Sequence, residues 1–221
     1  MSEKSKNAIF ISQTNLHEML LSILTLWLSF FPFLRKQEIV PPGTVRFQEN
    51  RYIDTEVISN FEWMVYLYKI KNDSTAAFYK SMLPDTSQII NGKNKYSNPK
   101  FADIPLTGIS EFQALTYCKW RSNFVSNNII DSKNICLSGQ REYAKFDKVY
   151  KVVYRLPTPE ELKTVSGMPK KVKPARNFEE MTSDGNVVVT DAFTRKAVTK
   201  NVSEAAALNR TFRCVAYFEK R

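Results

Sequence analysis

The chain has 221 residues, of which 43% are hydrophobic and 13% aromatic, and its formal net charge is +10. This composition excludes a disordered chain and suits one folded domain of ordinary size with an appendage. Residues 1–37 hold four basic and two acidic residues, so residues 38–221 keep a net charge of +8. The densest basic run, Lys170 to Arg176, has no interleaved aromatics, which favours a solvated loop over a nucleic-acid or anionic-lipid surface.

The histidine and cysteine content limits the possible chemistry. His17 is the only histidine, so Ser-His-Asp and Cys-His catalysis are excluded within residues 38–221 of a single chain. Cys118, Cys136 and Cys214 are too few and too far apart for a thiolate zinc site. They allow one disulfide and one free thiol.

Residues 19–34 are sixteen uncharged, mostly apolar residues, which indicates a membrane segment. At about 1.5 Å per residue a helix of this length spans roughly 24 Å, which is short of a ~30 Å hydrocarbon core. No small-x-small cleavage site or lipid-attachment cysteine follows, which favours an uncleaved anchor. The alternative is a buried helix of the domain, but the segment has no polar face.

The charges beside this segment leave its orientation open. Arg35 and Lys36 follow it directly, and the positive-inside rule would then keep the following domain in the cytoplasm. We nevertheless expect residues 19–34 to hold the protein at the membrane or to export it, with residues 38–221 outside the cytoplasm. Residues 1–37 thus form a tail and signal or anchor segment.

The folded part is expected to start near Glu38, and its first helix to cover about 60–70. Ser59 and Glu62 have the spacing of a capping box. The hydrophobic staple at this helix start is assigned to Ile58 and Trp63. One helical face is expected to carry the apolar residues Phe61, Met64, Val65 and Tyr68.

Two further helix starts follow the same logic. Ser110 and Gln113 predict a helix to about Phe124, with an inward Cys118. The apolar stripe of this helix is expected to hold Ala114, Leu115 and Cys118. The sequence from Thr158 to Glu161 predicts a third, brief helix with proline at its first position.

Three segments rich in β-branched and aromatic residues are predicted strands: 149–156, 186–190 and 211–218. Residues 127–147, which include Cys136, have no clean period and are interpreted as an insertion loop. Helices mixed with strands predict a mixed α+β fold for residues 38–221.

Four separated stretches, in the correct order, resemble the formylglycine-generating enzyme, or sulfatase-modifying factor, family. Val57 to Trp63 is similar to that family's E-V-T-N-x-E-Y, and the stretch from Ile104 to Trp120 to its P-V-x-x-V-S…A-x-x-Y-C-x-W. Tyr154 to Leu162 is similar to Y-R-L-P-T-E-A-E-W, and Phe212 to Val215 to G-F-R-C-V. A fainter match, Gly185 to Val187, is similar to G-N-V. The motif residues are Ser59, Glu62, Trp120, Arg155, Pro157, Thr158, Glu161, Asn186 and Arg213.

The resemblance implies a C-type-lectin-like fold in a single domain. It also implies a structural disulfide between Cys118 and Cys214, with Cys136 left free. The competing possibility is a cytoplasmic domain in which both residues are buried thiols.

Departures from the family's pattern imply that its chemistry is lost. The pair of copper-binding cysteines expected before G-F-R-C is missing, because Asp191 to Arg213 contains no cysteine. The calcium-loop positions hold Thr182 and Val189, and valine offers no oxygen ligand. Family members that use iron employ histidines, which residues 38–221 do not have. We therefore expect no catalytic residue, no metal and no cofactor.

Three functions compete. The first two are a non-catalytic binding module of the bacterial cell envelope, with a protein or glycan partner, and a structural subunit of a secretion or gliding-motility assembly. The second is favoured by a resemblance to gliding-motility lipoproteins of type IX secretion, carried by the wording from Asn98 to Arg121. The third is an enzyme of altered chemistry that uses Glu160 and Glu161, but a solvated helix turn and a capping role already explain these carboxylates.

Overall fold

The structure, a computed structural model, describes residues 39–85, 95–131, 149–168, 171–175, 178–191, 194, 196–200 and 209–221. All of them belong to the compact unit Ile39–Arg221. The hydrophobic segment 19–34 and Cys136 lie outside the described residues, so the predictions for them stay predictions. No helix in the described ranges is long and apolar enough to cross a membrane.

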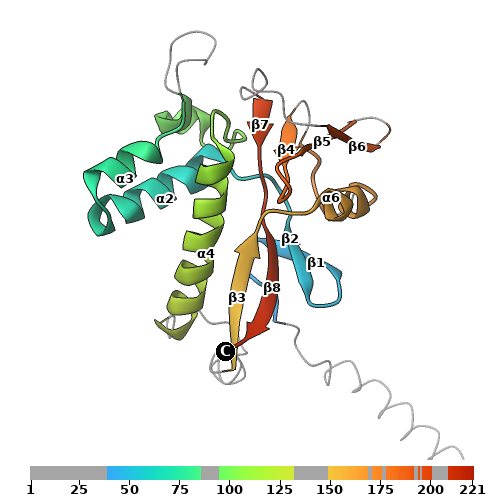
Figure 1. Ribbon diagram of the computed structural model, residues 1–221, viewed down its shortest axis with the longest axis horizontal. Coiled ribbons are helices and arrows are strands. Elements are labelled where there is room, and N and C mark those ends of the chain that lie inside the picture. The colour runs from blue at the N-terminus through green and yellow to red at the C-terminus, as the bar shows by residue number, and fades with distance from the viewer. Residues whose placement is uncertain are drawn as a thin grey trace, which may run out of the picture. The chain divides into compact units, whose positions relative to one another are not determined.

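The first of two sheets is antiparallel and has four strands in the order β1-β2-β8-β3 (Figure 1). Its strands are β1 (Thr44–Gln48), β2 (Arg51–Asp54), β3 (Tyr150–Arg155) and β8 (Val215–Lys220). The central pair therefore joins one strand from the start of the domain to the last strand of the chain.

The second sheet has the order β6-β5-β4-β7, in which β7 runs parallel to β4 and the other neighbours are antiparallel. Its strands are β4 (Glu179–Met181), β5 (Val187–Thr190), β6 (Ala197–Lys200) and β7 (Arg210–Thr211). Because only three residues separate β7 from β8, the end of the chain passes directly from the second sheet into the first.

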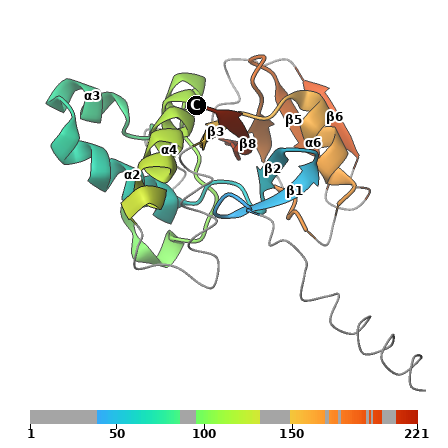
Figure 2. The same cartoon turned by 90° about the horizontal axis from the view of Figure 1, so that it is seen from below.

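Helices cover both sides of the first sheet, and the two views agree on their placement (Figures 1 and 2). One side carries α2 (Asn60–Asp73), α3 (Ala76–Ser81) and the long α4 (Glu111–Asp131). The other side carries α6 (Pro159–Ser166). Two short 3-10 turns, η2 (Lys95–Ser97) and η3 (Pro99–Phe101), follow α3 in the chain. The mixed α/β class predicted from the sequence is confirmed.

Successive side chains of β2 and β8 point to opposite faces of the sheet and so contribute to two separate cores. Tyr52 and Ala216 face the larger core with the aromatic side chains of α2 and α4. Their neighbours Ile53 and Val215 face the smaller core, which includes Leu162 of α6. Successive side chains of a strand point to opposite faces, so one pair of strands supplies both cores.

The three predicted capping boxes are confirmed. At the start of α2, the side chains of Ser59 and Glu62 each accept a hydrogen bond from the other residue's backbone N–H. Thr158 and Glu161 do the same at the start of α6. At the start of α4, Gln113 accepts from the Ser110 N–H (2.7 Å) and Ser110 Oγ accepts from the Gln113 N–H (3.2 Å). Each pair satisfies two donors that a helix end otherwise leaves open.

The predicted apolar face of α2 is wrong. The helix buries Trp63, Tyr66, Leu67 and Ile70. The face predicted as apolar instead carries an exposed stripe, with exposed fractions of 57% for Phe61, 36% for Val65 and 69% for Tyr68. Both faces are apolar, so periodicity alone did not decide between them; the larger core selects the face with Trp63. We call Phe61, Val65 and Tyr68 the α2 stripe.

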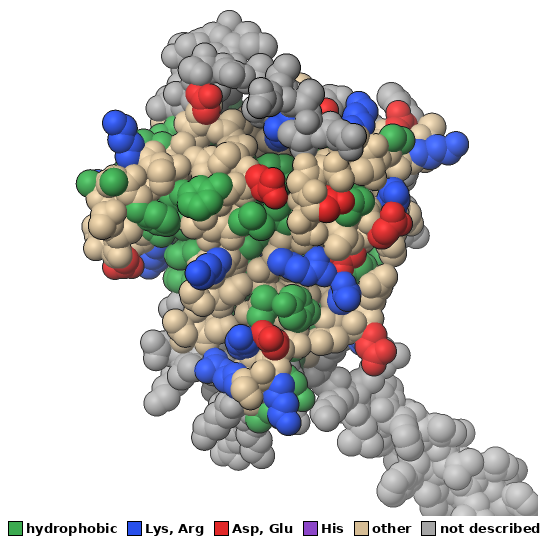
Figure 3. Space-filling view, in the orientation of Figure 1, with side chains coloured by type: hydrophobic (Ala, Val, Ile, Leu, Met, Phe, Trp, Pro, Cys, Tyr) green, Lys and Arg blue, Asp and Glu red, His purple; other side chains and the backbone are tan. Residues whose placement is uncertain are grey.

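The end of α4, the strand predicted over 211–218 and the exposure of Leu115 also differ from the predictions made from the sequence. The helix predicted to end at Phe124 continues as α4 to Asp131, so 127–131 are helical rather than the start of an insertion loop. The strand predicted over 211–218 is interrupted at Phe212–Cys214, between β7 and β8. Leu115 is 44% exposed, whereas Cys118 is buried as predicted. Figure 3 shows apolar side chains reaching the surface on the side of α4.

Two serines of α4 satisfy the open edge of β3, which is the outermost strand of its sheet. Ser122 Oγ accepts from the Tyr154 N–H (2.8 Å), and Ser126 Oγ accepts from the Val152 N–H (3.2 Å). An edge strand otherwise presents unpaired backbone groups that favour pairing with another chain. The helix therefore closes this edge through side chains four residues apart on one face.

Ser122→Ala is expected to lower the free energy of unfolding by about 1–2 kcal/mol, because the Tyr154 N–H loses its acceptor in a partly buried setting. Thr116→Ala is the matched control. Thr116 makes the same bond to the carbonyl four residues earlier in α4 as Ser122 does, but none to β3. Urea unfolding of both variants measures the difference, and equal losses would show that β3 does not depend on this contact.

Candidate functional site

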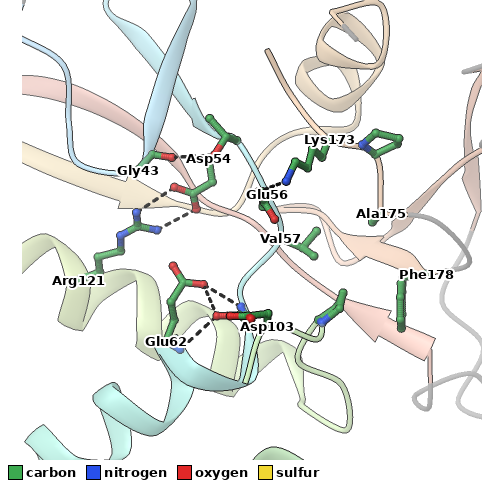
Figure 4. Close-up of a pocket in the computed structure, with 14 residues that line it drawn as sticks. Gly43, Asp54, Glu56, Val57, Glu62, Asp103, Arg121, Lys173, Ala175 and Phe178 are labelled. Carbon is green, nitrogen blue, oxygen red and sulfur yellow. Dashed lines mark hydrogen bonds and ion pairs between the residues drawn. The ribbon is translucent and has the colours of Figure 1, made fainter. Parts of the chain in front are cut away.

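A cleft of about 560 Å³ lies beside the end of β2 and the start of α2, with residues 173–178, which precede β4, also in its lining (Figure 4). Its walls come from separated segments: the turn before β1, the end of β2, the start of α2, residues 103–105, the middle of α4 and residues 173–178. Figure 4 shows Arg121 at one end and Phe178 at the other. Ser59 and Glu62 are the two sequence-predicted motif residues that line it.

The floor of the cleft is a buried ion pair. Arg121 donates from both terminal nitrogens to the Asp54 carboxylate (2.8 and 2.9 Å), and the Cys214 N–H donates to the same carboxylate (2.8 Å). Burial alone would lower the pKa of Arg121, but Asp54 raises it well above its ordinary value, so the guanidinium stays charged. Gly43 has a φ of +77°, and a Cβ there would lie 3.3 Å from Arg121 Nη2. A larger residue would crowd this floor.

Arg213, the arginine of F-R-C-V, joins the two sheets behind the cleft. Its side chain is 1% exposed and donates to both oxygens of Glu180, at 2.5 and 3.0 Å. It also donates to the carbonyls of Asp54 (3.2 Å) and Lys173 (2.9 Å). This pairing is structural, because loss of Glu180 would leave the Arg213 charge buried and uncompensated.

Glu161 forms a second charged centre, at the start of α6. Its carboxylate accepts from Arg51, from both terminal nitrogens of Arg155 and from the Thr158 N–H. Burial alone would raise the pKa of Glu161, but the hydrogen bonds from Arg155 and Thr158 prevail and lower it from 4.5 to about 2. The structure thus gathers Arg155, Thr158 and Glu161 of the predicted motif into one structural cluster away from the cleft.

The structure brings Cys118 and Cys214 together as buried free thiols whose sulfur atoms lie 3.4 Å apart. Burial and the neighbouring Cys118 raise the pKa of Cys214 well above its ordinary value. Thiol oxidation proceeds through the thiolate, so a disulfide here is expected to form during folding, before the pair is enclosed.

The remaining motif residues are structural as well. Trp120 stacks on Phe124 with ring centroids 5.0 Å apart. The Pro157 carbonyl accepts from the Ser183 N–H. Asn186 donates from its side chain to Asp184 (3.0 Å) in the turn before β5. Within the described ranges, no three His, Cys, Asp or Glu side chains are grouped as a metal site requires.

Sequence reasoning missed Asp54 and Glu180 as site residues. Both are buried acids, and each forms an ion pair with a buried arginine far away in the chain. One signal was present: each is an acid within a short strand, Asp54 at the end of β2 and Glu180 in the middle of β4. Only the tertiary partner, and not the neighbouring sequence, distinguishes such a buried acid from an exposed one.

The chain matches no protein-family model, no curated protein and no solved structure. The family resemblance therefore rests on its motif residues alone.

Protonation of Glu161 provides a pH test. Because the folded pKa of about 2 lies below the unfolded value of 4.5, its stabilisation is present above about pH 5 and is lost as pH falls towards 2. Both arginines are partly exposed, so we expect Glu161→Gln to cost about 2 kcal/mol at pH 7, with the gap from wild type closing by pH 2. Urea unfolding across this range measures it.

Glu160→Gln is the control for this test, since Glu160 is 79% exposed and pairs only with Lys163 among the described residues. Its free energy of unfolding should stay within about 0.5 kcal/mol of the wild-type value across the whole pH range. A constant difference between wild type and Glu161→Gln across pH would show that the charge of Glu161 does not stabilise the fold.

Protein isolated from an oxidising compartment is expected to carry a Cys118–Cys214 disulfide, with Cys136 free. Closing so long a loop restricts the unfolded chain, so reduction should lower the free energy of unfolding by about 2–4 kcal/mol. Mass spectrometry of non-reduced digests identifies the linkage. A Cys118–Cys136 bond, or three free thiols in protein taken from the envelope, would exclude it.

Proposed function

We propose that residues 38–221 form a degenerate, C-type-lectin-like domain of the formylglycine-generating type that acts as a non-catalytic binding module. The domain belongs to the bacterial cell envelope, and residues 19–34 hold it at the membrane or export it. Convergence of two motifs that are far apart in the chain supports the family: Cys118 lies against Cys214, 96 residues later.

The observation that carries a binding role is the cleft. It is open, about 560 Å³ in volume, and has a floor fixed by the Asp54–Arg121 pair. A ligand held there would meet groups whose positions are already set, so little ordering would oppose binding. Asp54 accepts from Arg121, and Glu62 accepts from the helix cap through Oε2, so both carboxylates are held in fixed positions that suit binding a ligand.

A second candidate, a structural subunit of a secretion or gliding-motility assembly, is favoured by the α2 stripe. Its three exposed apolar side chains lie on one helical face, and the neighbouring Ile104 is 41% exposed. Backbone bonds from Asn60 to Ile104 and from Phe61 to Ala102 hold residues 102–104 beside the start of α2. Contiguous exposed apolar surface of this kind is typical of protein contacts.

Partner retention by the full-length protein in native membranes distinguishes these functions. Val57→Trp fills the cleft, and we expect it to abolish co-purification of the partner after cross-linking. Val198→Trp is the matched control, because Val198 is 56% exposed on β6 and does not line the cleft. Tyr68→Ser tests the stripe: loss in this variant alone would favour the assembly subunit.

The same preparations test catalysis. With copper(I) and a cysteine-containing sulfatase peptide, wild type is expected to produce no formylglycine. Detection of the aldehyde by its mass, abolished in Cys214→Ser, would contradict the non-catalytic proposal. Retention of every partner by both Val57→Trp and Tyr68→Ser would contradict the two binding functions.

A further inference from the structure

The cleft has an excess of negative charge, although the domain around it is basic. Asp54 is paired with Arg121, and Glu56 with Lys173 at 2.6 Å. Two further carboxylates, those of Glu62 and Asp103, line the cleft without a cationic partner among the described residues. The cleft therefore carries two uncompensated negative charges within residues 38–221, whose net charge is +8.

These two carboxylates lie at the same end of the cleft. The bonds from Asn60 and Phe61 to residues 102–104 hold Asp103 beside the first turn of α2, where Glu62 sits. Both side chains line the cleft (Figure 4), Asp103 exposed and Glu62 half-buried. Glu62 uses only Oε2 in its helix cap, accepting from the Ser59 N–H (2.8 Å) and Oγ (2.9 Å). Among the described residues, no donor meets Glu62 Oε1 or the Asp103 carboxylate.

The cleft lining beyond these carboxylates is apolar, and one of its residues, Pro105, is bridged to Ser59 at the acidic end. Its side chains are half-buried, apart from the buried Ala175, and in Figure 4 Val57, Ala175 and Phe178 lie away from Arg121. These wall residues are Val57, Pro105, Pro174, Ala175 and Phe178. An apolar wall that leads to a pair of carboxylates matches a ligand with an aliphatic stem and a cationic head.

We propose that this cleft binds an alkylammonium or guanidinium group on an aliphatic stem, as a lysine or arginine side chain of a partner polypeptide presents it. The stem lies on the apolar wall, and the head pairs with Glu62 Oε1 and Asp103. An anionic ligand is disfavoured, because Arg121 is already engaged by Asp54 and the Pro42 carbonyl (3.0 Å). This inference rests on the proposed binding function.

The test uses the full-length protein and fluorescence anisotropy with labelled, end-capped Gly-Lys-Gly and Gly-Arg-Gly peptides. A Gly-Glu-Gly peptide is the charge-reversed probe, and unlabelled cadaverine is a competitor that separates a free amine from a peptide side chain. We expect binding of the Lys and Arg peptides, weaker competition by cadaverine, no binding of the Glu peptide, and affinity that falls with added salt.

Glu62→Gln removes one charge and keeps the cap, since Gln113 performs the same capping role at the start of α4. Glu62→Gln and Asp103→Asn are each expected to weaken binding of the Lys peptide about threefold to tenfold. Glu160→Gln, which is remote from the cleft, should leave the affinity for the Lys peptide within twofold of the wild-type value. Unchanged thermal midpoints show that the variants remain folded.

Several results would overturn the ligand assignment: preferred binding of the Glu peptide, equal affinity in Glu62→Gln and Asp103→Asn, or calcium binding that these variants abolish. If the cationic peptides fail to bind while Val57→Trp still loses its native partner, the assignment of the ligand is wrong and the binding function stands. If the cationic peptides fail to bind and Val57→Trp also retains every partner, the proposed binding function of the cleft is contradicted as well.

Discussion

The buried junction between Asp54 and Arg213 is the constraint on which the rest of the structure depends. Arg213 spans the gap between the sheets, donating to Glu180 of β4 and to the Asp54 carbonyl at the end of β2. The Asp54 carboxylate in turn holds Arg121 of α4 and the backbone of Cys214. Loss of one partner in such a buried network typically costs about 3–5 kcal/mol, because the others are left charged in the interior.

The three-residue link between β7 and β8 runs through this junction. Phe212, Arg213 and Cys214 are each fully or almost fully buried, although their side chains differ in kind. Phe212 and Cys214 belong to the larger core, whereas Arg213 reaches Glu180. Phe212 and Cys214 thus share one side of the segment and Arg213 takes the other, so the link keeps the alternation of a strand while it passes from one sheet to the other.

The junction gives the cleft its shape and its fixed floor. The same side chains that join the sheets hold Arg121 in place and position residues 173–175 through the Lys173 carbonyl. A floor fixed in this way presents the lining groups of the cleft in set positions.

The sequence by itself determined the local features of this protein, and the tertiary structure decided which faces and partners they use. Capping at Ser59 and Thr158 was predictable, because it depends on residues three positions apart. The strands at 150–155 and 187–190 were predictable from composition. The buried face of α2 was not, because both of its faces are apolar and only the core distinguishes Trp63 from Tyr68. The pairing of Asp54 with Arg121, 67 residues apart, was equally hidden, because an acid at a strand end looks the same whether it faces water or a buried arginine.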